Sequence, residues 1–501
     1  LLTKAMDLQN SFTIKGVNRQ IVVHELRWDD GLKWNELQLI TGKQELFRYS
    51  INPVIHWKRN REYFLMSNTL DLKYSKFKKI DYLSLSAALC LATLPFSIKL
   101  NTLVILIFSS GLLVYTLINK KRIVIKPREF FVGSTVFIVA LIWLLFTSNH
   151  ASGFSYIERS ASALLFPFLF SIIYNQYKLN INYILVLFMI SCFLRYVFFL
   201  YEIIEFELVF IFDYWKEILI QFNQLFKLHA LHPSYFSMFL GFCSLICYNY
   251  FVFSKTALRK GFWIVGLLVF LVFNLSLASK MPIMATLLSL VSVAVVQIIR
   301  KSNKKKIVKI GSLLFLGCIL IVLFLKEVPN SISQDLNNYY NILKGEEIED
   351  IYDYNQYGIN SSLDTWEKTN RIHIWKSSIE IVKENLLIGV GTGDMKEELN
   401  NKFRIHSQEY LATKDTNSHN QILDYLIKYG LIGFLMICMA FFAYYSNAWN
   451  NSNQLFLMFL VLCCLCMLTE NILNRQFGIV FFFFINSMFY FSKPIDKTLP
   501  K

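Results

Sequence analysis

A histidine and an asparagine, His419-Asn420, precede the motif Gly430-Leu-Ile-Gly433, with nine residues in between. An imidazole can accept and release a proton near neutral pH, so histidine suits general acid or base catalysis. The pair lies at the end of a polar segment, 326–427, just before an apolar segment that begins near residue 428. We therefore expect the chemistry of this chain to occur where these two segments meet.

The composition indicates which solvent surrounds most of the chain. Hydrophobic residues make up 55% of the sequence, aromatic residues 16% and charged residues 17%, and the mean hydropathy is +0.42. A spanning helix needs roughly 20 predominantly apolar residues. Twelve segments meet this description, near 80–97, 102–118, 130–148, 161–175, 182–203, 233–253, 261–278, 281–299, 307–325, 428–446, 455–469 and 476–492. The sequence thus predicts a polytopic membrane protein.

Basic residues predict how these segments are oriented, because Lys and Arg next to spans are retained in the cytoplasm. Alternate connections are rich in Lys and Arg, namely those near 73–79, 120–128, 255–260 and 300–309, whereas the others carry few. Both termini are therefore predicted to be cytoplasmic, and the segment 326–427 to lie outside. We assign the formal net charge of +15 to this asymmetry and to anionic lipid, and expect no binding of nucleic acid.

Two predicted outer segments are long enough to shape a site. In the first, about 205–232, apolar residues recur at helical spacing and predict an amphipathic helix. In the second, 326–427, a helix is predicted to begin at Arg371, with Asn370 as its N-cap. The glycine-rich segment Gly389-Val-Gly391-Thr-Gly393 lacks the Lys-Ser/Thr of a phosphate-binding loop. It predicts a tight turn, and Asp394 is a candidate cap for a following short helix.

The chain divides into four regions by composition. Residues 1–65 are polar, begin with Leu1 and include strand-like stretches such as 19–24, so the membrane protein is expected to start near Met66. Residues 66–325 hold the first nine predicted spans, 326–427 the large outer loop, and 428–501 the last three spans with a cytoplasmic tail. The nine cysteines all fall in predicted spans, where they act as small apolar residues and predict no disulfide framework.

Several motifs together resemble the O-antigen ligase and polymerase superfamily of bacterial membrane glycosyltransferases. They are Arg371-Ile-His-Ile-Trp375, Gly389-Val-Gly391-Thr-Gly393, Ser418-His419-Asn420-Gln421, Gly430-Leu-Ile-Gly433, His232-Pro-Ser-Tyr235, Ser276-Leu-Ala-Ser279-Lys280, Glu470-Asn471 and Arg475-Gln-Phe-Gly478. The resemblance covers about residues 79–492. It departs from the family pattern at Lys280, where ligases usually have Arg, and at Phe434, where they often have Thr.

The resemblance implies an all-α polytopic membrane protein, similar to GT-C enzymes, with about twelve transmembrane helices and one large helical periplasmic loop between the ninth and tenth spans. It implies glycan transfer from an undecaprenyl-diphosphate carrier to a glycolipid or glycan acceptor such as lipid A-core, at the outer face of the bacterial inner membrane. Neither a metal nor a cofactor is expected, and the configuration of the anomeric carbon is expected to invert.

The chemistry of this transfer suggests a role for particular residues. A departing diphosphate develops negative charge, which fixed cations stabilise, and Arg371 and Lys280 are the candidates. His419 is the candidate base for the acceptor hydroxyl or the residue that orients the acceptor, and Asn420 is expected to form hydrogen bonds beside it. His232 is a candidate for substrate contact or simply a helix cap.

Two further arginines are candidates for substrate binding, each with a structural alternative. Arg195 lies inside a predicted span, where a cation is usually functional, although pairing with Glu202 would also explain it. Arg475 lies in an outer turn together with Glu470, and an ion pair between these two residues is the structural alternative.

Two other functions remain open from the sequence. A polymerase would use the same donor but transfer the growing chain onto a new carrier-linked repeat unit. A transporter would instead place polar residues and broken helices near the middle of the bilayer, whereas here the candidate residues gather at the predicted outer face.

Overall fold

The computed structural model describes residues 82–120, 123–177, 179–205, 231–277, 279–300, 363–413 and 416–492, together with four short strands near the N-terminus. The chain forms two compact units, Leu1–Ile80 and Asp81–Lys501. In the first unit, β1 (Ser11–Phe12) pairs with β2 (Ile21–Val22), and β3 (Glu36–Ile40) pairs with β4 (Leu46–Ser50), both antiparallel. The strand-like stretch noted at 19–24 includes β2.

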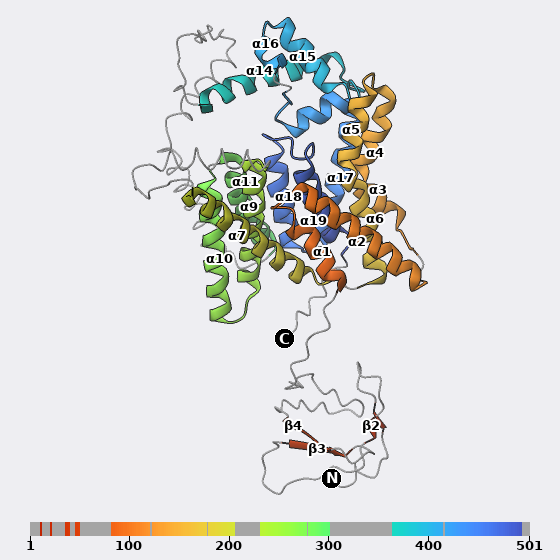
Figure 1. Cartoon of the computed structure of the whole chain (residues 1–501), viewed down its shortest axis with the longest axis vertical. Coiled ribbons are helices and arrows are strands. Elements are labelled where there is room, and N and C mark those ends of the chain that lie inside the picture. Colours follow the sequence, from red (N-terminus) through yellow and green to blue (C-terminus); the bar gives the residue numbers. More distant parts are fainter. Residues whose placement is uncertain are drawn as a thin grey trace. The chain divides into compact units, whose positions relative to one another are not determined.

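The described part of the second unit is helical. Its helices are α1 (Tyr82–Ala92), α2 (Ile98–Ile118), α3 (Pro127–Gly133), α4 (Thr135–Ile142), the 3₁₀ helix η2 (Trp143–Phe146), α5 (His150–Ser160), α6 (Ser162–Gln176), α7 (Ile181–Glu205), α9 (Pro233–Phe253), α10 (Ala257–Ser276), α11 (Lys280–Arg300), α14 (Leu363–Glu384), α15 (Met395–Ile405), α16 (Glu409–Thr413), α17 (Gln421–Asn450), α18 (Gln454–Cys466) and α19 (Gln476–Tyr490). Figure 1 shows α14, α15 and α16 together at one end of the bundle.

Six of the described helices are long and apolar enough to cross a membrane, or seven if α3 and the α4–η2 pair, bent by 70°, form one span. Of the twelve predicted segments, 307–325 lies outside the described residues, and each of the others overlaps a helix. The predicted amphipathic helix at 205–232 also lies almost wholly outside the described residues. The number of spans therefore stays a prediction.

Aromatic side chains form much of the core of the helical bundle. The rings of Phe242, Phe459 and Phe481 contact one another, with centroid distances of 5.2 to 5.7 Å. They join α9, α18 and α19, and all three side chains are fully buried. Such edge-on ring contacts add specific geometry to apolar packing. These three helices form the buried framework that carries the loops at their ends.

Helix α17 bends at Gly430, whose φ of 57° and ψ of −164° interrupt the helix. The glycine-rich segment packs against this bend, and Val390 and Gly391 donate hydrogen bonds to the carbonyls of Ile427 and Lys428, at 2.8 and 2.9 Å. Beyond the bend, the N–H groups of Leu431 and Ile432 donate to Leu386 and Leu387. The backbone groups that lose helical partners at the bend are thus paired again.

The predicted turn at the glycine-rich segment is confirmed, since Gly389 and Gly391 have φ of 76° and 102°. The predicted start of the helix at Arg371 is wrong, because α14 begins at Leu363. Neither proline nor glycine interrupts 363–384, and Asn370 is tolerated inside the helix.

Asp394 does hold the N-cap position of α15, but its side chain makes no capping hydrogen bond. Its two carboxylate oxygens instead accept hydrogen bonds from the backbone N–H groups of Ser148 and Asn149, each at 2.7 Å. The carboxylate therefore joins the glycine-rich segment to the start of α5.

Candidate functional site

Glu470, in the connection between α18 and α19, lies between a guanidinium and an imidazole side chain. Its Oε1 accepts a hydrogen bond from Nη2 of Arg371 in α14, at 3.3 Å. Its Oε2 lies 3.8 Å from Nδ1 of His419, a distance at which a protonated imidazole pairs electrostatically without a close hydrogen bond. The side chain of Glu470 is 16% exposed, and those of Arg371 and His419 are each 31% exposed. Arg371, His419 and Glu470 form what we term the triplet.

The charges around Glu470 outweigh the effect of its burial. Burial alone would raise the pKa of Glu470, but interaction with His419 and the positive fields of His232, His419 and Arg371 lower it, and the net shift is downward. A nearby cation stabilises the ionised carboxylate, which accounts for this direction. His232 is thus also close to the triplet, so the structure brings three of the predicted site residues together around one carboxylate.

The backbone at His419 has an unusual conformation. Its φ is +44°, in the left-handed region that non-glycine residues seldom occupy. Its N–H donates to Oδ1 of Asn417 at 3.0 Å, and the preceding carbonyl, of Ser418, accepts a hydrogen bond from Nε1 of Trp375 at 3.0 Å. These contacts hold the turn against α14. Backbone strain of this kind often accompanies functional sites.

Asn420 has a structural task that the sequence did not suggest. Its side-chain oxygen accepts hydrogen bonds from the N–H groups of Ile422 and Leu423, at 2.9 and 3.2 Å, and so caps the start of α17. Capping of this kind stabilises a helix by about 1 kcal/mol. The amide oxygen is therefore engaged by the helix and does not form a hydrogen bond with His419.

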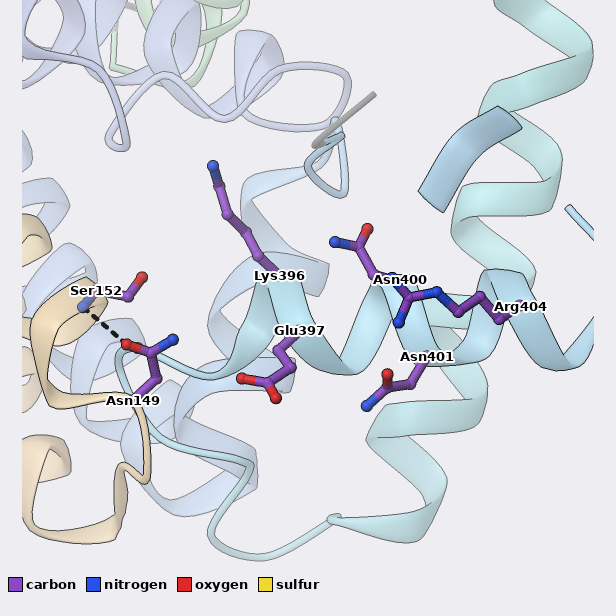
Figure 2. Close-up of a pocket in the computed structure, with 8 residues that line it drawn as sticks. Asn149, Ser152, Lys396, Glu397, Asn400, Asn401 and Arg404 are labelled. Carbon is purple, nitrogen blue, oxygen red and sulfur yellow. Dashed lines mark hydrogen bonds between the residues drawn. The ribbon is translucent and has the colours of Figure 1, made fainter. Parts of the chain in front are cut away.

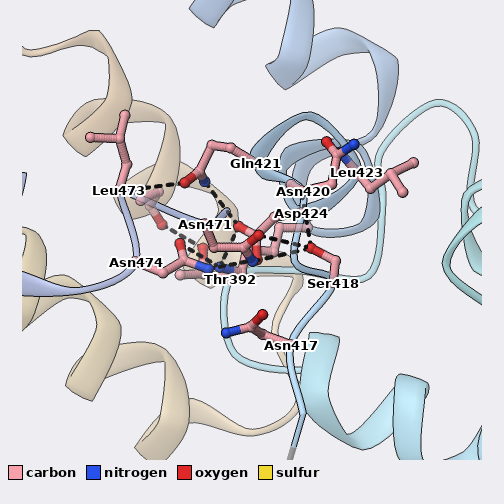
Figure 3. A network of polar contacts seen from close by, with 12 residues as sticks. Thr392, Asn417, Ser418, Asn420, Gln421, Leu423, Asp424, Asn471, Leu473 and Asn474 are labelled. Atoms are coloured by element: carbon pink, nitrogen blue, oxygen red, sulfur yellow. Dashed lines mark hydrogen bonds and ion pairs between the residues drawn. The ribbon is translucent and has the colours of Figure 1, made fainter. Parts of the chain in front are cut away.

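A polar network next to the triplet surrounds Asp424, whose side chain is fully buried (Figure 3). Lys428 donates to Oδ2 of this carboxylate at 2.8 Å, and the amides of Asn471 and Asn474 donate to Oδ1 at 3.0 and 2.7 Å. Asn471 also donates to the hydroxyl of Ser418 at 3.1 Å. Because a buried carboxylate requires several donors, this network ties the residue before His419 to the residue after Glu470.

Two more contacts hold the connection between α18 and α19 in place. Gln421 donates its N–H to Met467 at 2.8 Å and accepts the N–H of Leu473 at 2.8 Å with its side chain. At the other end, a Cβ added to Gly478 would lie 1.8 Å from the carbonyl oxygen of Ile472. Only glycine allows this close approach, so the connection folds back tightly over the start of α19.

His232 and Lys280 mark the ends of two helices near this connection. His232 is the N-cap of α9, and its Nδ1 accepts the N–H of Ser234 at 3.3 Å, which confirms the capping role. Tyr235 donates to the carbonyl of Asn471 at 3.2 Å, and Ser279 donates to Ser234 at 3.3 Å. Lys280 follows Ser279 as the first residue of α11, so both helix ends face the region of the triplet.

The remaining two candidates have other surroundings. Arg195 is only 5% exposed, and its guanidinium lies 4.2 Å from the ring centroid of Phe199, with Phe198 and Phe96 also within 6 Å. Arginine packs readily on aromatic faces. Arg475 is an exposed N-cap residue of α19. The suggested ion pair between Glu470 and Arg475 is wrong, because Glu470 pairs with Arg371 and His419.

Sequence reasoning identified Glu470 only as part of an outer turn and missed Asp424 and Lys428. A signal for the latter pair was present, since opposite charges four residues apart at the edge of an apolar segment face each other on a helix. The ion pair between Glu470 and Arg371 joins residues 99 positions apart, so no local pattern could reveal it.

Comparison with known proteins supports the resemblance. Residues 265–438 match the family model described as O-antigen ligase, and this range contains Arg371 and His419 but not His232 or Glu470. A search of curated proteins found none that matches the chain. Together with the long apolar helices, this match over part of the chain supports its similarity to the O-antigen ligase family of membrane proteins.

Proposed function

We propose that the protein transfers a glycan from an undecaprenyl-diphosphate carrier to a hydroxyl group of an acceptor, lipid A-core or a similar glycolipid, at the outer face of the inner membrane. The family match supports glycan transfer in general terms. The observation that carries the proposal is the triplet, in which Arg371 and His419, distant in sequence, meet at one buried carboxylate.

The transfer is a single displacement. The oxygen of the acceptor hydroxyl forms a bond to the anomeric carbon of the glycan, while the bond from that carbon to the carrier diphosphate breaks. The hydroxyl proton passes to His419, and the electron pair of the broken bond leaves with the diphosphate. Attack from the side opposite the leaving group inverts the anomeric carbon. Since the diphosphate is stable as an anion, it needs no general acid.

Arg371 and Lys280 stabilise the departing diphosphate. A guanidinium presents a planar pair of donors to two phosphate oxygens, whereas an ammonium acts as a point charge. Arg371 would turn part of its hydrogen-bonding capacity from Glu470 to the diphosphate. Lys280, at the start of α11, would supply the second positive charge, with His232 beside it at the start of α9.

Glu470 holds the base in place. Its carboxylate lies on the Nδ1 side of His419, so Nε2 is the nitrogen that takes the proton. The negative charge of Glu470 stabilises the imidazolium that forms, as a buried aspartate does in serine hydrolases. Glu470 is therefore a positioning residue, and His419 and Arg371 are the catalytic residues.

The test is transfer by the purified full chain in liposomes, with a labelled undecaprenyl-diphosphate glycan and a choice of acceptors. Label on lipid A-core identifies a ligase, and a ladder on the carrier identifies a polymerase. His419→Ala and Arg371→Ala should each lower kcat by about 100-fold or more. His406→Ala is the matched control, because His406 contacts Glu380, at 2.7 Å, in the same loop. Turnover near the wild-type rate in His419→Ala would contradict the assignment.

A further inference from the structure

A polar cavity of about 410 Å³ lies between the start of α5 and one face of α15. Its lining is formed by Asn149, Ser152, Gly393, Lys396, Glu397, Asn400, Asn401 and Arg404. Figure 2 labels all of these residues except Gly393. Cavities that hold small ligands commonly have volumes of about 300–1,000 Å³. Apart from Gly393, every residue of the lining has a polar side chain, so the cavity is unsuited to a lipid chain.

The lining residues of α15 are not required for the packing of this helix. Its apolar face, with Met395, Leu399 and Phe403, is buried in a small core together with Ile374 and Ile381. The lining residues are at positions 396, 397, 400, 401 and 404. Counted from 396, the others follow after one, four, five and eight residues, which places all five on one face of the helix, opposite the apolar face. Packing thus fixes the apolar face and leaves the polar face open to solvent or to a ligand.

The two walls of the cavity are firmly joined. Asp394 binds the N–H groups of Ser148 and Asn149, each at 2.7 Å, and Gly393 donates to the hydroxyl of Thr147 at 3.3 Å. Asn149 in turn caps α5 by accepting the N–H of Ser152 at 3.1 Å. A cavity whose walls are fixed before the ligand arrives binds without a large ordering cost.

The lining matches a sugar better than an anion. Carboxamides, a hydroxyl, two cations and one carboxylate provide donors and acceptors side by side, as the hydroxyl groups of a sugar require. The side-chain oxygen of Asn400 is buried and accepts no hydrogen bond from the described residues. A sugar hydroxyl would donate to this acceptor, whereas the ionised oxygens of a phosphate group carry no proton to donate.

The cavity is also placed for a substrate of the proposed reaction. Its walls come from two segments, near 149–160 and within 326–427, that the charge pattern assigns to the outer side together with His419.

We infer that this cavity binds sugar residues of a glycan substrate at a distance from the reacting anomeric carbon. The inference rests on the proposed function and adds a glycan-binding subsite to it. Binding energy gained there would hold a long glycan while His419 and Arg371 act on its end or on the acceptor. The bound sugar could belong to the donor or to the acceptor, because both carry glycans. The experiment therefore tests a probe from each.

The experiment measures binding without turnover, by equilibrium dialysis with the purified full chain. One probe is the oligosaccharide that mild acid releases from the undecaprenyl-diphosphate glycan used in the transfer assay. The other is the core oligosaccharide released from the lipid A-core acceptor used in that assay. The test variant is Lys396→Ala with Asn400→Ala, and the control is Lys402→Ala, whose ammonium pairs with Glu384 at 2.5 Å and is not part of the cavity.

We expect the double variant to bind one probe at least tenfold more weakly than the wild type and Lys402→Ala, with unchanged thermal unfolding. Weaker binding of the first probe assigns the subsite to the donor, and of the second to the acceptor. Equal binding by the double variant, or no binding of either probe by the wild type, would overturn the inference. Since binding is scored apart from transfer, a wild-type protein that binds but never transfers refutes the proposed function alone.

Discussion

At the scale of single residues, the triplet shows how one carboxylate can organise a guanidinium and an imidazole. Arg371 and His419 are each 31% exposed, and Glu470 contacts both of them. In the proposed reaction the diphosphate would compete with Glu470 for Arg371, whose hydrogen bond to the carboxylate is long, at 3.3 Å. This arrangement makes separate predictions for Arg371 and Glu470.

Replacing Arg371 by Lys keeps the positive charge but removes the planar pair of donors. We expect Arg371→Lys to lower kcat by about 100-fold, with a much smaller change in KM, because the lost contacts form mainly as the diphosphate departs. Lys376→Ala, an exposed cation on the same helix, is the control and should leave both parameters unchanged. Steady-state transfer kinetics give the answer, and a wild-type kcat for Arg371→Lys would show that charge alone suffices.

The lowered pKa of Glu470 predicts a stability that depends on pH. Its ionised form stabilises the folded state above the ordinary carboxyl pKa near 4.5, and this contribution disappears as the pH falls through the lowered pKa of the folded state. Glu470→Gln should therefore be less stable than the wild type at pH 7, by about 1.5–3 kcal/mol. The difference should shrink toward pH 3.

Thermal unfolding in detergent at several pH values measures this difference. A difference in stability between the wild type and Glu470→Gln that stays constant from pH 7 to pH 3 would mean that the charge of Glu470 does not stabilise the triplet. Transfer assays on the same variant separate positioning from folding, since Glu470→Gln should lower kcat even at temperatures where it remains folded.

At the scale of elements, the site depends on an interrupted helix and a folded-back connection. Helix α17 bends at Gly430, and the glycine-rich segment supplies the hydrogen bonds that the bend removes. Asp424 and Lys428 lie just before this bend, where they bind the connection between α18 and α19. The bend therefore separates a short polar helical segment, which serves the site, from the longer apolar part of α17.

Gly430 is required by this bend. A Cβ at this position would lie 2.4 Å from the carbonyl of Leu387, and its positive φ disfavours any other residue. We expect backbone strain alone in Gly430→Ala to destabilise the protein by about 1–3 kcal/mol. The clash of the new Cβ with Leu387 should add to this cost. Transfer activity should fall with it.

Gly111 provides the matched control for this substitution. It lies in the middle of α2, and nothing would contact an added Cβ within 4 Å, so Gly111→Ala should leave stability unchanged or raise it slightly. Thermal unfolding of the two variants in the same detergent compares them directly. Equal unfolding temperatures would show that the bend can reform without glycine.

At the scale of the whole molecule, the bundle places all the candidate catalytic residues at one end. α14, α17 and the connection between α18 and α19 meet there, while the polar cavity lies between α5 and α15. The charge pattern assigns this end to the outer side of the membrane, where the proposed lipid-linked glycan donor would be presented. Orientation is thus the property on which the proposed reaction depends most broadly.

A reporter enzyme fused after Asn360 should report the outer side of the membrane, because 326–427 is predicted to be external. A fusion after Lys260, in the first turn of α10, should report the cytoplasm, because Lys255, Arg259 and Lys260 are retained there. The two fusions control for each other's expression. A cytoplasmic signal from the fusion after Asn360 would contradict the orientation and with it the proposed reaction.

The sequence alone determined the helical, membrane-embedded class of the chain and the residues able to do chemistry. Apolar segments of sufficient length predict helices because a backbone in lipid must satisfy its own hydrogen bonds. Helix caps such as His232, and the turn at Gly389 and Gly391, follow from local preferences. His419 and Arg371 were identified because their residue types suit proton transfer and phosphate binding.

Only the tertiary structure decided which partners these residues have. Glu470 joins Arg371 and His419, and Asn471 joins Asp424 and Ser418, through contacts between positions about 50 to 100 residues apart. Pairings of this kind depend on how whole helices pack, so no local spacing encodes them. The early start of α14 was missed for a related reason. A possible N-cap such as Asn370 marks the start of a helix only when the residues before it are not helical themselves.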